Sequence, residues 1–123
     1  MISFDHFTIE DEGPIYAQII KHIKREIIAG IIQDQDEMPS RRMLSVLLGV
    51  NPNTIQKAYR LLEAENIITS HSGAKSYVTL TDVQIKQIKS QQLEGDAKSF
   101  VLALKQMGIS KEEAIQLISR VWD

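Results

Sequence analysis

The segment Gly49-Val50-Asn51-Pro52 combines a residue that typically ends a helix with residues that typically start the next one. Glycine readily adopts the left-handed conformation that closes many helices. Asparagine is a good N-cap, and proline fits the first helical position because its missing N–H would have no partner there. Ser40 provides another N-cap further upstream. The sequence therefore predicts two short helices joined by a tight turn.

Apolar residues recur at helical spacing on one side of each predicted helix. The expected buried positions are Leu44, Leu47 and Leu48 in the first helix and Ile55, Ala58, Tyr59 and Leu62 in the second, which is expected over residues 52–65. Two short helices joined by a glycine-containing turn form a helix-turn-helix. In that motif the N-terminal end of the second helix presents side chains to base edges in the DNA major groove.

The same stretch is locally basic, although the whole chain has a net charge of −2. Between residues 38 and 62 there is no acidic side chain, whereas the basic ones are Arg41, Arg42, Lys57 and Arg60. A local basic face is typical of a nucleic-acid contact. Asn and Gln can pair with adenine, and Arg with guanine. The alternative is a solvated polar face on an ordinary helical hairpin.

A resemblance to a known family extends from about residue 14 to about residue 81. Its densest parts read Pro39-Ser40-Arg41-Arg42-x-Leu44 and Gly49-Val50-Asn51-Pro52-Asn53-Thr54-Ile55-x-Lys57-Ala58-Tyr59-x-x-Leu62-Glu63, flanked by Pro14-Ile15-Tyr16-x-Gln18-Ile19, Gly30, Gly73 and Tyr77-Val78. These residues resemble the DNA-binding domain of the GntR family of bacterial transcription regulators. The resemblance implies a winged helix-turn-helix that binds specific DNA sequences.

The resemblance also implies which residues contact DNA. Arg42 matches the arginine of the family's Pro-Ser-x-Arg motif and is expected to contact a base. Ser40 and Arg41 lie at a helix N-terminus, which suits phosphate. Further contacts to bases and nearby phosphates are expected from Asn51, Pro52, Asn53, Thr54 and Gln56, contacts to the phosphate backbone from Lys57, and contacts from the wing at Gly73 and Lys75.

Three positions where the family has glycine hold other residues in this sequence. Gln35 stands where the family commonly has glycine, so the turn there is expected to differ slightly. Asn66 replaces another glycine and is expected to adopt the left-handed conformation. Lys75 replaces the second glycine of the wing, between strands expected over 67–71 and 76–80. We expect Lys75 to contact phosphate or the minor groove, and a solvated loop lysine is the alternative.

Two amphipathic helices are expected after Thr81, the first to about Met107 and the second after the capping box that begins at Ser110. This tail is too short to enclose a small-molecule cavity by itself, and a second copy of the chain is the simplest cover for its apolar surface. Such tails resemble those of the YtrA-like subfamily, which implies dimerisation. The expected contact residues are Phe100, Val101, Leu104, Ile115, Ile118 and Trp122.

The predicted fold is mainly α with a small β-hairpin: a winged helix-turn-helix domain over 1–81, with an N-terminal extension over 1–13 that packs on the first helix, and a two-helix dimerisation tail over 82–123. The predicted function is a cytoplasmic repressor that binds a palindromic operator in double-stranded DNA as a homodimer. A winged-helix protein-interaction module is the alternative. The sequence leaves open whether a small-molecule effector exists.

Several classes of protein are disfavoured by what the sequence lacks. There is no cysteine, so neither a disulfide framework nor a thiolate metal site is expected. The histidines, His6, His22 and His71, are scattered, and His22 is expected on the solvent side of the first helix. We therefore expect no enzyme activity, metal or cofactor. No stretch approaches the ~20 apolar residues of a membrane span.

Overall fold

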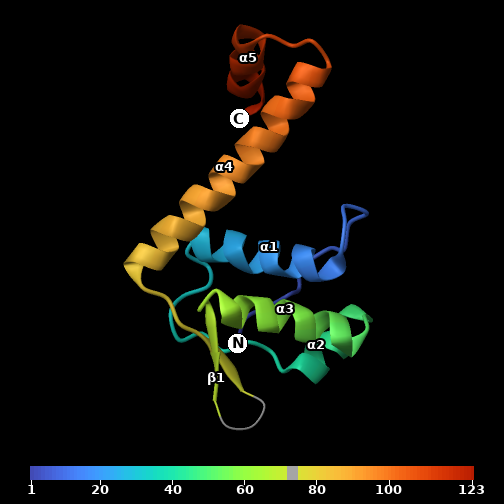
Figure 1. Cartoon of the computed structure of the whole chain (residues 1–123), viewed down its shortest axis with the longest axis vertical. Coiled ribbons are helices and arrows are strands. Elements are labelled where there is room, and N and C mark those ends of the chain that lie inside the picture. The colour runs from blue at the N-terminus through green and yellow to red at the C-terminus, as the bar shows by residue number, and fades with distance from the viewer. Residues whose placement is uncertain (72–74) are drawn as a thin grey trace. The chain divides into compact units, whose positions relative to one another are not determined.

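The computed structural model describes residues 1–71 and 75–123. Its elements are α1 (Ile15–Ile28), α2 (Arg41–Leu48), α3 (Pro52–Ala64), β1 (Ile68–Ser70), β2 (Ser76–Val78), α4 (Asp82–Gln106) and α5 (Lys111–Val121) (Figure 1). The predicted mainly helical fold, with a hairpin after the helix-turn-helix and two further helices, is confirmed. The chain divides into two compact units, Met1–Lys89 and Ser90–Asp123.

The turn between α2 and α3 follows the predicted cap chemistry. The Ser40 hydroxyl accepts a hydrogen bond from the Met43 N–H at 3.0 Å, and α2 ends at Gly49 with φ 66°. The Asn51 side chain accepts from the Asn53 N–H at 2.8 Å, directly before Pro52 opens α3. These local bonds fix the ends of both helices, so the start of α3 has a defined direction.

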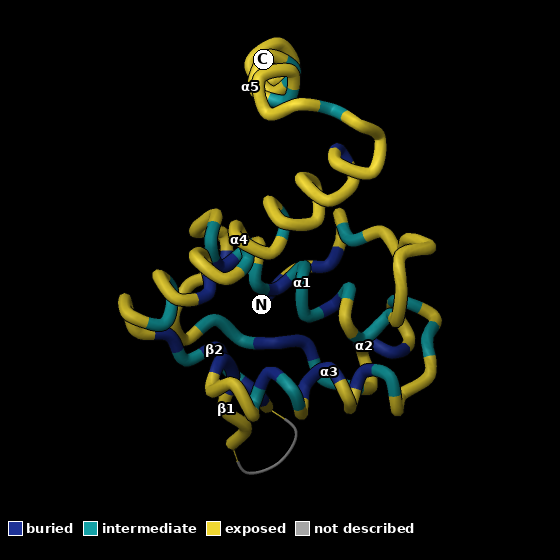
Figure 2. Tube along the Cα trace, turned by 45° about the horizontal axis from the view of Figure 1, so that its top comes forward, coloured by how far each residue is buried: buried dark blue, intermediate teal, exposed yellow. Residues whose placement is uncertain are grey.

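The core of the first unit lies between α1, α2 and α3. Every residue predicted for the inner face of α3 is buried, and α1 buries its isoleucine stripe at Ile19, Ile23 and Ile27. Figure 2 shows these buried positions recurring along α1 and α3. This burial holds α3 in place while its opposite side remains exposed.

The prediction for α2 was wrong at Leu47, whose side chain is 59% exposed. Leu44 is buried and Leu48 is half-buried, as predicted. The third inner position is Ser45, whose hydroxyl donates to the carbonyl of Val50 at 2.7 Å. At 100° per residue, Ser45 and Leu47 lie on opposite sides of Leu44, so burying Ser45 turns Leu47 outward.

The wing is paired on both edges of β2. On one edge β1 pairs antiparallel with β2, with Ile68 opposite Val78. On the other edge the Gln35 N–H donates to the carbonyl of Val78 at 2.7 Å, and the Met38 N–H donates to the carbonyl of Ser76 at 2.9 Å. The base of the wing is therefore joined to the segment that leads into α2.

Two of the unusual turn positions adopt the left-handed conformation. Asn66 has φ 60°, as predicted, where the chain leaves α3 for the wing. Gln35 has φ 72°, a conformation that glycine adopts without strain and that a side chain disfavours. The turn thus keeps a glycine-like backbone without a glycine.

The N-terminal segment packs on the first unit, as predicted. Ile2 and Phe4 are buried, and the Ile2 N–H donates to the carbonyl of Glu37 at 2.9 Å. The expectation for His22 was wrong, because its ring is half-buried against Phe4, with 4.9 Å between ring centroids. Its Nε2 lies 3.3 Å from a carboxylate oxygen of Glu26.

Of Thr81 and Asp82, the two candidate caps of the helix after the wing, Thr81 makes the capping bond, and the last helix begins at the predicted cap Ser110. The Thr81 hydroxyl accepts from the Gln84 N–H at 3.2 Å, and the Ser110 hydroxyl accepts from the Glu113 N–H at 3.2 Å. Ile85 and Ile88, in the first turns of α4, join the core of the first unit. Within the described parts of the chain, no helix has both the length and the hydropathy required to span a membrane.

The left-handed Gln35 gives the first testable prediction. Gln35→Gly should raise the free energy of unfolding by about 1 kcal/mol, because it removes the steric cost of a side chain at positive φ. Urea denaturation measures the change. Gln33→Gly is the matched control: Gln33 is exposed in the same turn but has no positive φ, so glycine there should lower stability. A destabilised Gln35→Gly variant would contradict the interpretation.

Candidate nucleic-acid interface

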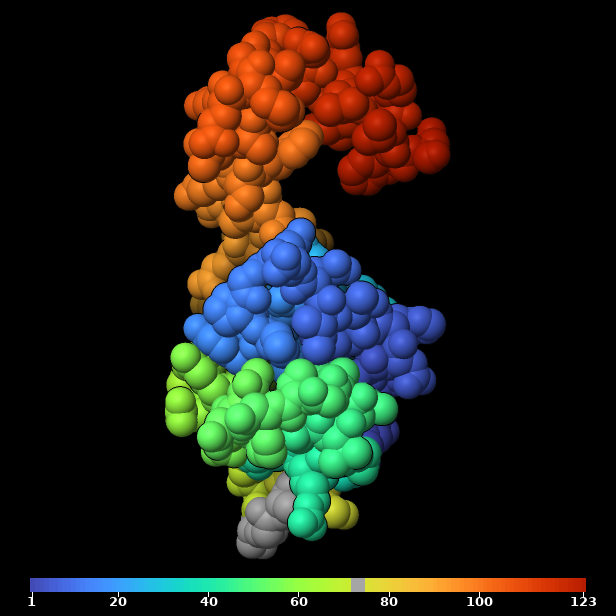
Figure 3. All heavy atoms as spheres, turned by 90° about the vertical axis from the view of Figure 1, so that its right-hand side faces the viewer, coloured from blue at the N-terminus to red at the C-terminus, as the bar shows by residue number. Residues whose placement is uncertain are grey.

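An open hollow lies where the beginnings of α2 and α3 meet. The residues that line it are Arg41, Arg42, Ser45, Val46, Pro52, Asn53 and Gln56. Residues of α2 and α3 (teal to green) lie side by side on the face of the molecule shown in Figure 3. The structure thus gathers five of the predicted DNA contacts, Arg41, Arg42, Pro52, Asn53 and Gln56, on one surface.

Three of these side chains are exposed and have no side-chain partner among the described residues. Arg42, Asn53 and Gln56 make no side-chain hydrogen bond or ion pair with any residue of the described chain. Arginine offers donors to guanine, and the amides of Asn and Gln offer a donor and an acceptor to adenine. The hollow therefore presents unused hydrogen-bonding groups of the types that read bases.

Arg41 differs because its guanidinium is bound within the protein. Its Nη2 lies 2.7 Å from a carboxylate oxygen of Glu63, and its Cζ lies 5.0 Å from the centroid of the Tyr59 ring. Ser70 in β1 donates to the same Glu63 oxygen at 2.8 Å. Arg41 thus joins α2 to α3 and, through Glu63, to the wing, and its phosphate contact remains a prediction.

Ser40 and Asn51 use their side-chain oxygens for capping. Each accepts a hydrogen bond from the first turn of its own helix. These caps set where α2 and α3 begin. Both residues therefore help to position the predicted contact residues in the first turns of the two helices. Thr54, the next predicted contact, is half-buried on the first turn of α3.

The remaining predicted contacts lie outside the hollow. Lys57 is exposed on α3, and its Nζ lies 4.1 Å from the centroid of the Tyr16 ring of α1, a cation–π distance. Lys75 is exposed directly before β2, and its carbonyl accepts from the His71 N–H at 2.9 Å. Gly73 lies outside the described residues.

Tyr59 is a positioning residue that the sequence pattern marked only as part of the buried stripe. Its side chain is fully buried, and its hydroxyl donates to the carbonyl of Pro39 at 2.6 Å. Burial raises the pKa of the Tyr59 phenol, and the nearby Arg41 guanidinium opposes the shift, so the phenol stays protonated and donates. A tyrosine at a buried position usually has a hydrogen-bond partner, and this was the available signal.

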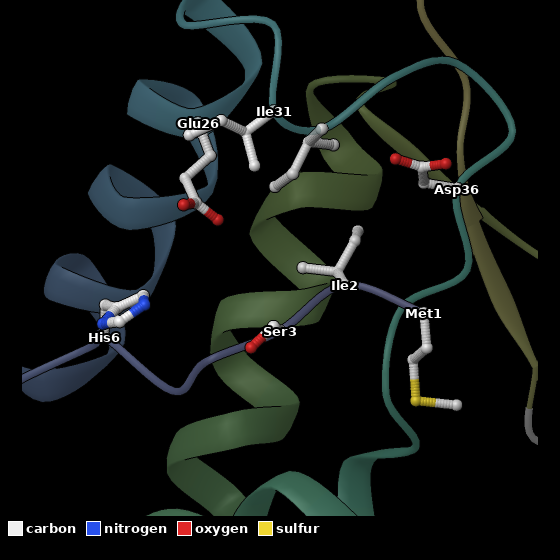
Figure 4. Close-up of a pocket in the computed structure, with 8 residues that line it drawn as sticks. Met1, Ile2, Ser3, His6, Glu26, Ile31 and Asp36 are labelled. Atoms are coloured by element: carbon white, nitrogen blue, oxygen red, sulfur yellow. The ribbon is translucent and has the colours of Figure 1, made fainter.

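A second hollow lies beneath the N-terminal segment. It is lined by Met1, Ile2, Ser3, His6, Glu26, Ile31, Ile32 and Asp36. Figure 4 shows the carboxylates of Glu26 and Asp36 on different sides, with apolar side chains between them. Among residues 1–71 and 75–123, no group of three or more His, Cys, Asp or Glu side chains is arranged to hold a metal ion.

The fold, together with the hollow that holds Arg42, Asn53 and Gln56, defines a winged helix-turn-helix protein of the type that binds double-stranded DNA. The sequence profile of the bacterial regulatory proteins of the gntR family matches residues 15–78. The chain belongs to the GntR family of DNA-binding transcription regulators, which are not enzymes.

Similarity to individual proteins extends beyond the DNA-binding domain. The chain is 32% identical to the HTH-type transcriptional repressor YtrA of Bacillus subtilis, over 88% of this chain and 84% of the relative. A GntR family transcriptional regulator from Listeria monocytogenes has a similar structure, with a TM-score of 0.80, 34% identity and coverage of 92% of this chain and 99% of that one. YtrA from Sulfolobus acidocaldarius gives a TM-score of 0.55 at 29% identity, over 98% and 95%. These similarities place the chain in the YtrA-like subfamily.

The hydrogen bond between Tyr59 and Pro39 gives a prediction for stability. Tyr59→Phe should lower the free energy of unfolding by about 1–3 kcal/mol, because it leaves the buried carbonyl without a donor. Chemical denaturation measures the loss. Tyr16→Phe is the control, since the half-buried Tyr16 hydroxyl has no hydrogen bond to the described residues. Equal stability losses in the two variants would show that the Tyr59 bond contributes nothing specific.

Proposed function

We propose that this protein is a transcriptional repressor that binds a palindromic operator as a homodimer. The base-reading part is supported by one observation: Arg42, Asn53 and Gln56, which have no side-chain partner within residues 1–71 and 75–123, converge in one open hollow. The repressor assignment is supported by the 32% identity to the Bacillus subtilis repressor YtrA. Bound to its operator in the bacterial cytoplasm, the protein blocks access of the transcription machinery to the promoter.

Each contact in this proposal has a chemical role. Arg42 donates to a guanine, and Asn53 and Gln56 read neighbouring base edges. Bases and phosphates also lie close to residues around the two helix N-termini, namely Ser40, Arg41, Asn51, Pro52 and Thr54. The DNA backbone or minor groove is contacted by Lys57, Gly73 and Lys75. Phosphate contacts fix the position of the protein, and base contacts provide the specificity.

The alternative, a protein-interaction module, fits this surface less well. The cores of protein–protein interfaces are depleted in charged residues and rich in apolar and aromatic side chains. The N-terminal half of α3 instead exposes Asn53, Gln56 and Lys57. A polar and basic surface of this kind is better suited to the edges of bases and to phosphate.

The proposed dimer forms through the tail, residues 82–123. In the Ser90–Asp123 unit, large apolar side chains remain exposed, from Phe100 and Val101 on α4 to Ile115, Ile118 and Trp122 near the C-terminus. Leu104 is only 7% exposed, so it supports the fold of this unit more than it offers surface. Apolar patches of this extent mark interaction sites, and a second copy covers them symmetrically.

The base-reading role of Arg42 can be tested by mutation. Arg42→Ala should weaken operator binding about 5- to 150-fold, equivalent to ~1–3 kcal/mol, and relax the preference at one base pair. Lys57→Ala should weaken binding to all sequences more evenly, because phosphates carry no direct sequence information. The measurement is a titration on an operator, mapped by protection in DNA upstream of the gene, and on a scrambled duplex. An equal loss on both duplexes in Arg42→Ala would exclude a base contact.

The role of the tail can be tested by truncation. A chain of residues 1–89 retains Ile85 and Ile88 in its core and should be a folded monomer. It should bind the mapped operator weakly and with strong salt sensitivity, because one domain makes fewer contacts than two. Light scattering gives the mass, circular dichroism the fold, and mobility shifts the affinity. A dimeric truncated chain, or one that binds as tightly as the intact chain, contradicts the proposed tail function.

A further inference from the structure

Val46 and Pro52 are the apolar side chains among the residues that line the hollow. Val46 lies on the exposed side of α2, its side chain is 77% exposed, and it lines the same surface as Arg42, Asn53 and Gln56. We infer that Val46 contacts the C5-methyl group of a thymine in the operator, beside the guanine that Arg42 reads. This inference rests on the proposed function.

The chemistry of the major groove restricts what Val46 can read. A valine side chain neither donates nor accepts hydrogen bonds, so it cannot select guanine, cytosine or adenine through their polar edges. The thymine methyl is the apolar group that base edges present in this groove. Contact with it removes apolar surface of both partners from water, which is favourable. Val46 therefore favours thymine where Arg42 favours guanine.

The helix also sets how far this thymine lies from the guanine. Val46 follows Arg42 by four residues on the same helix, and side chains at that spacing are neighbours about 5–6 Å apart. Successive base pairs are about 3.4 Å apart along DNA. The two contacts thus fall within about two base pairs of each other.

Exposure alone does not distinguish Val46 on α2. Met43 and Leu47 are also exposed large apolar residues of this helix, but neither lines the hollow. Leu47→Ala is therefore a matched control for Val46→Ala. Both variants shorten an exposed apolar side chain on the same helix, and alanine favours helix. Equal thermal unfolding temperatures verify that the folds of both variants are intact.

The test uses the full chain and the tightest duplex that it selects from a random library. Each thymine in one half-site is replaced singly by deoxyuridine, which removes only the methyl group. For the wild type, one replacement within about two base pairs of the guanine lost in Arg42→Ala should weaken binding about fourfold, the value for one buried methyl. The same replacement should have no effect on Val46→Ala and should keep its fourfold effect on Leu47→Ala.

Three other results overturn the inference. If no deoxyuridine affects the wild type, the methyl contact does not exist. If a replacement weakens DNA binding by Val46→Ala as much as binding by the wild type, Val46 does not contact that methyl group. If the wild type selects no duplex above random DNA, the proposed function fails and this inference fails with it. Tight wild-type binding without a Val46-dependent methyl effect contradicts the inference alone.

Discussion

The hydroxyl of Tyr59 donates to the carbonyl of Pro39 from the centre of the core, and the geometry of the DNA-binding surface depends on this bond. It attaches α3 to the residue that precedes the Ser40 cap of α2. The ion pair of Arg41 with Glu63 adds a second connection, between α2 and α3 and nearer the protein surface. One connection joins α3 to the segment that leads into α2 and the other joins α3 to the first residue of α2, so together they fix how α2 begins relative to α3. The proposed base-reading groups are placed by these contacts before DNA binds, so they need little reorganisation on binding.

Much of this fold was predictable because its signals are local. The cap of α2, the turn at Gly49 and the start of α3 each depend on residues a few positions apart, and the structure matches them. The buried stripe of α3 was predictable because a long helix with one inner face has a clear period. The left-handed Asn66 was expected because few other residues tolerate that conformation.

The rest depended on contacts between distant parts of the chain. The orientation of α2 was misjudged because the Ser45 hydroxyl satisfies the carbonyl of Val50, and periodicity treats serine as an outward residue. The packing of His22 depends on the N-terminal segment that covers it. The sequence indicated Arg41 as a surface cation, but its partner Glu63 lies 22 positions away. A sequence pattern identifies helices and strands more easily than it identifies the side-chain contacts that connect them.

In the proposed function, two copies of this surface read one symmetric DNA site. Selection of the full-length chain on a random duplex library, followed by sequencing, tests it most directly. A closed dimer imposes its two-fold symmetry on the DNA, and recognition helices in successive major grooves lie about one helical turn apart. We expect an enriched inverted repeat with half-site centres roughly 10 base pairs apart, or a multiple of that spacing. A direct repeat, an isolated half-site or no enrichment would contradict this proposal.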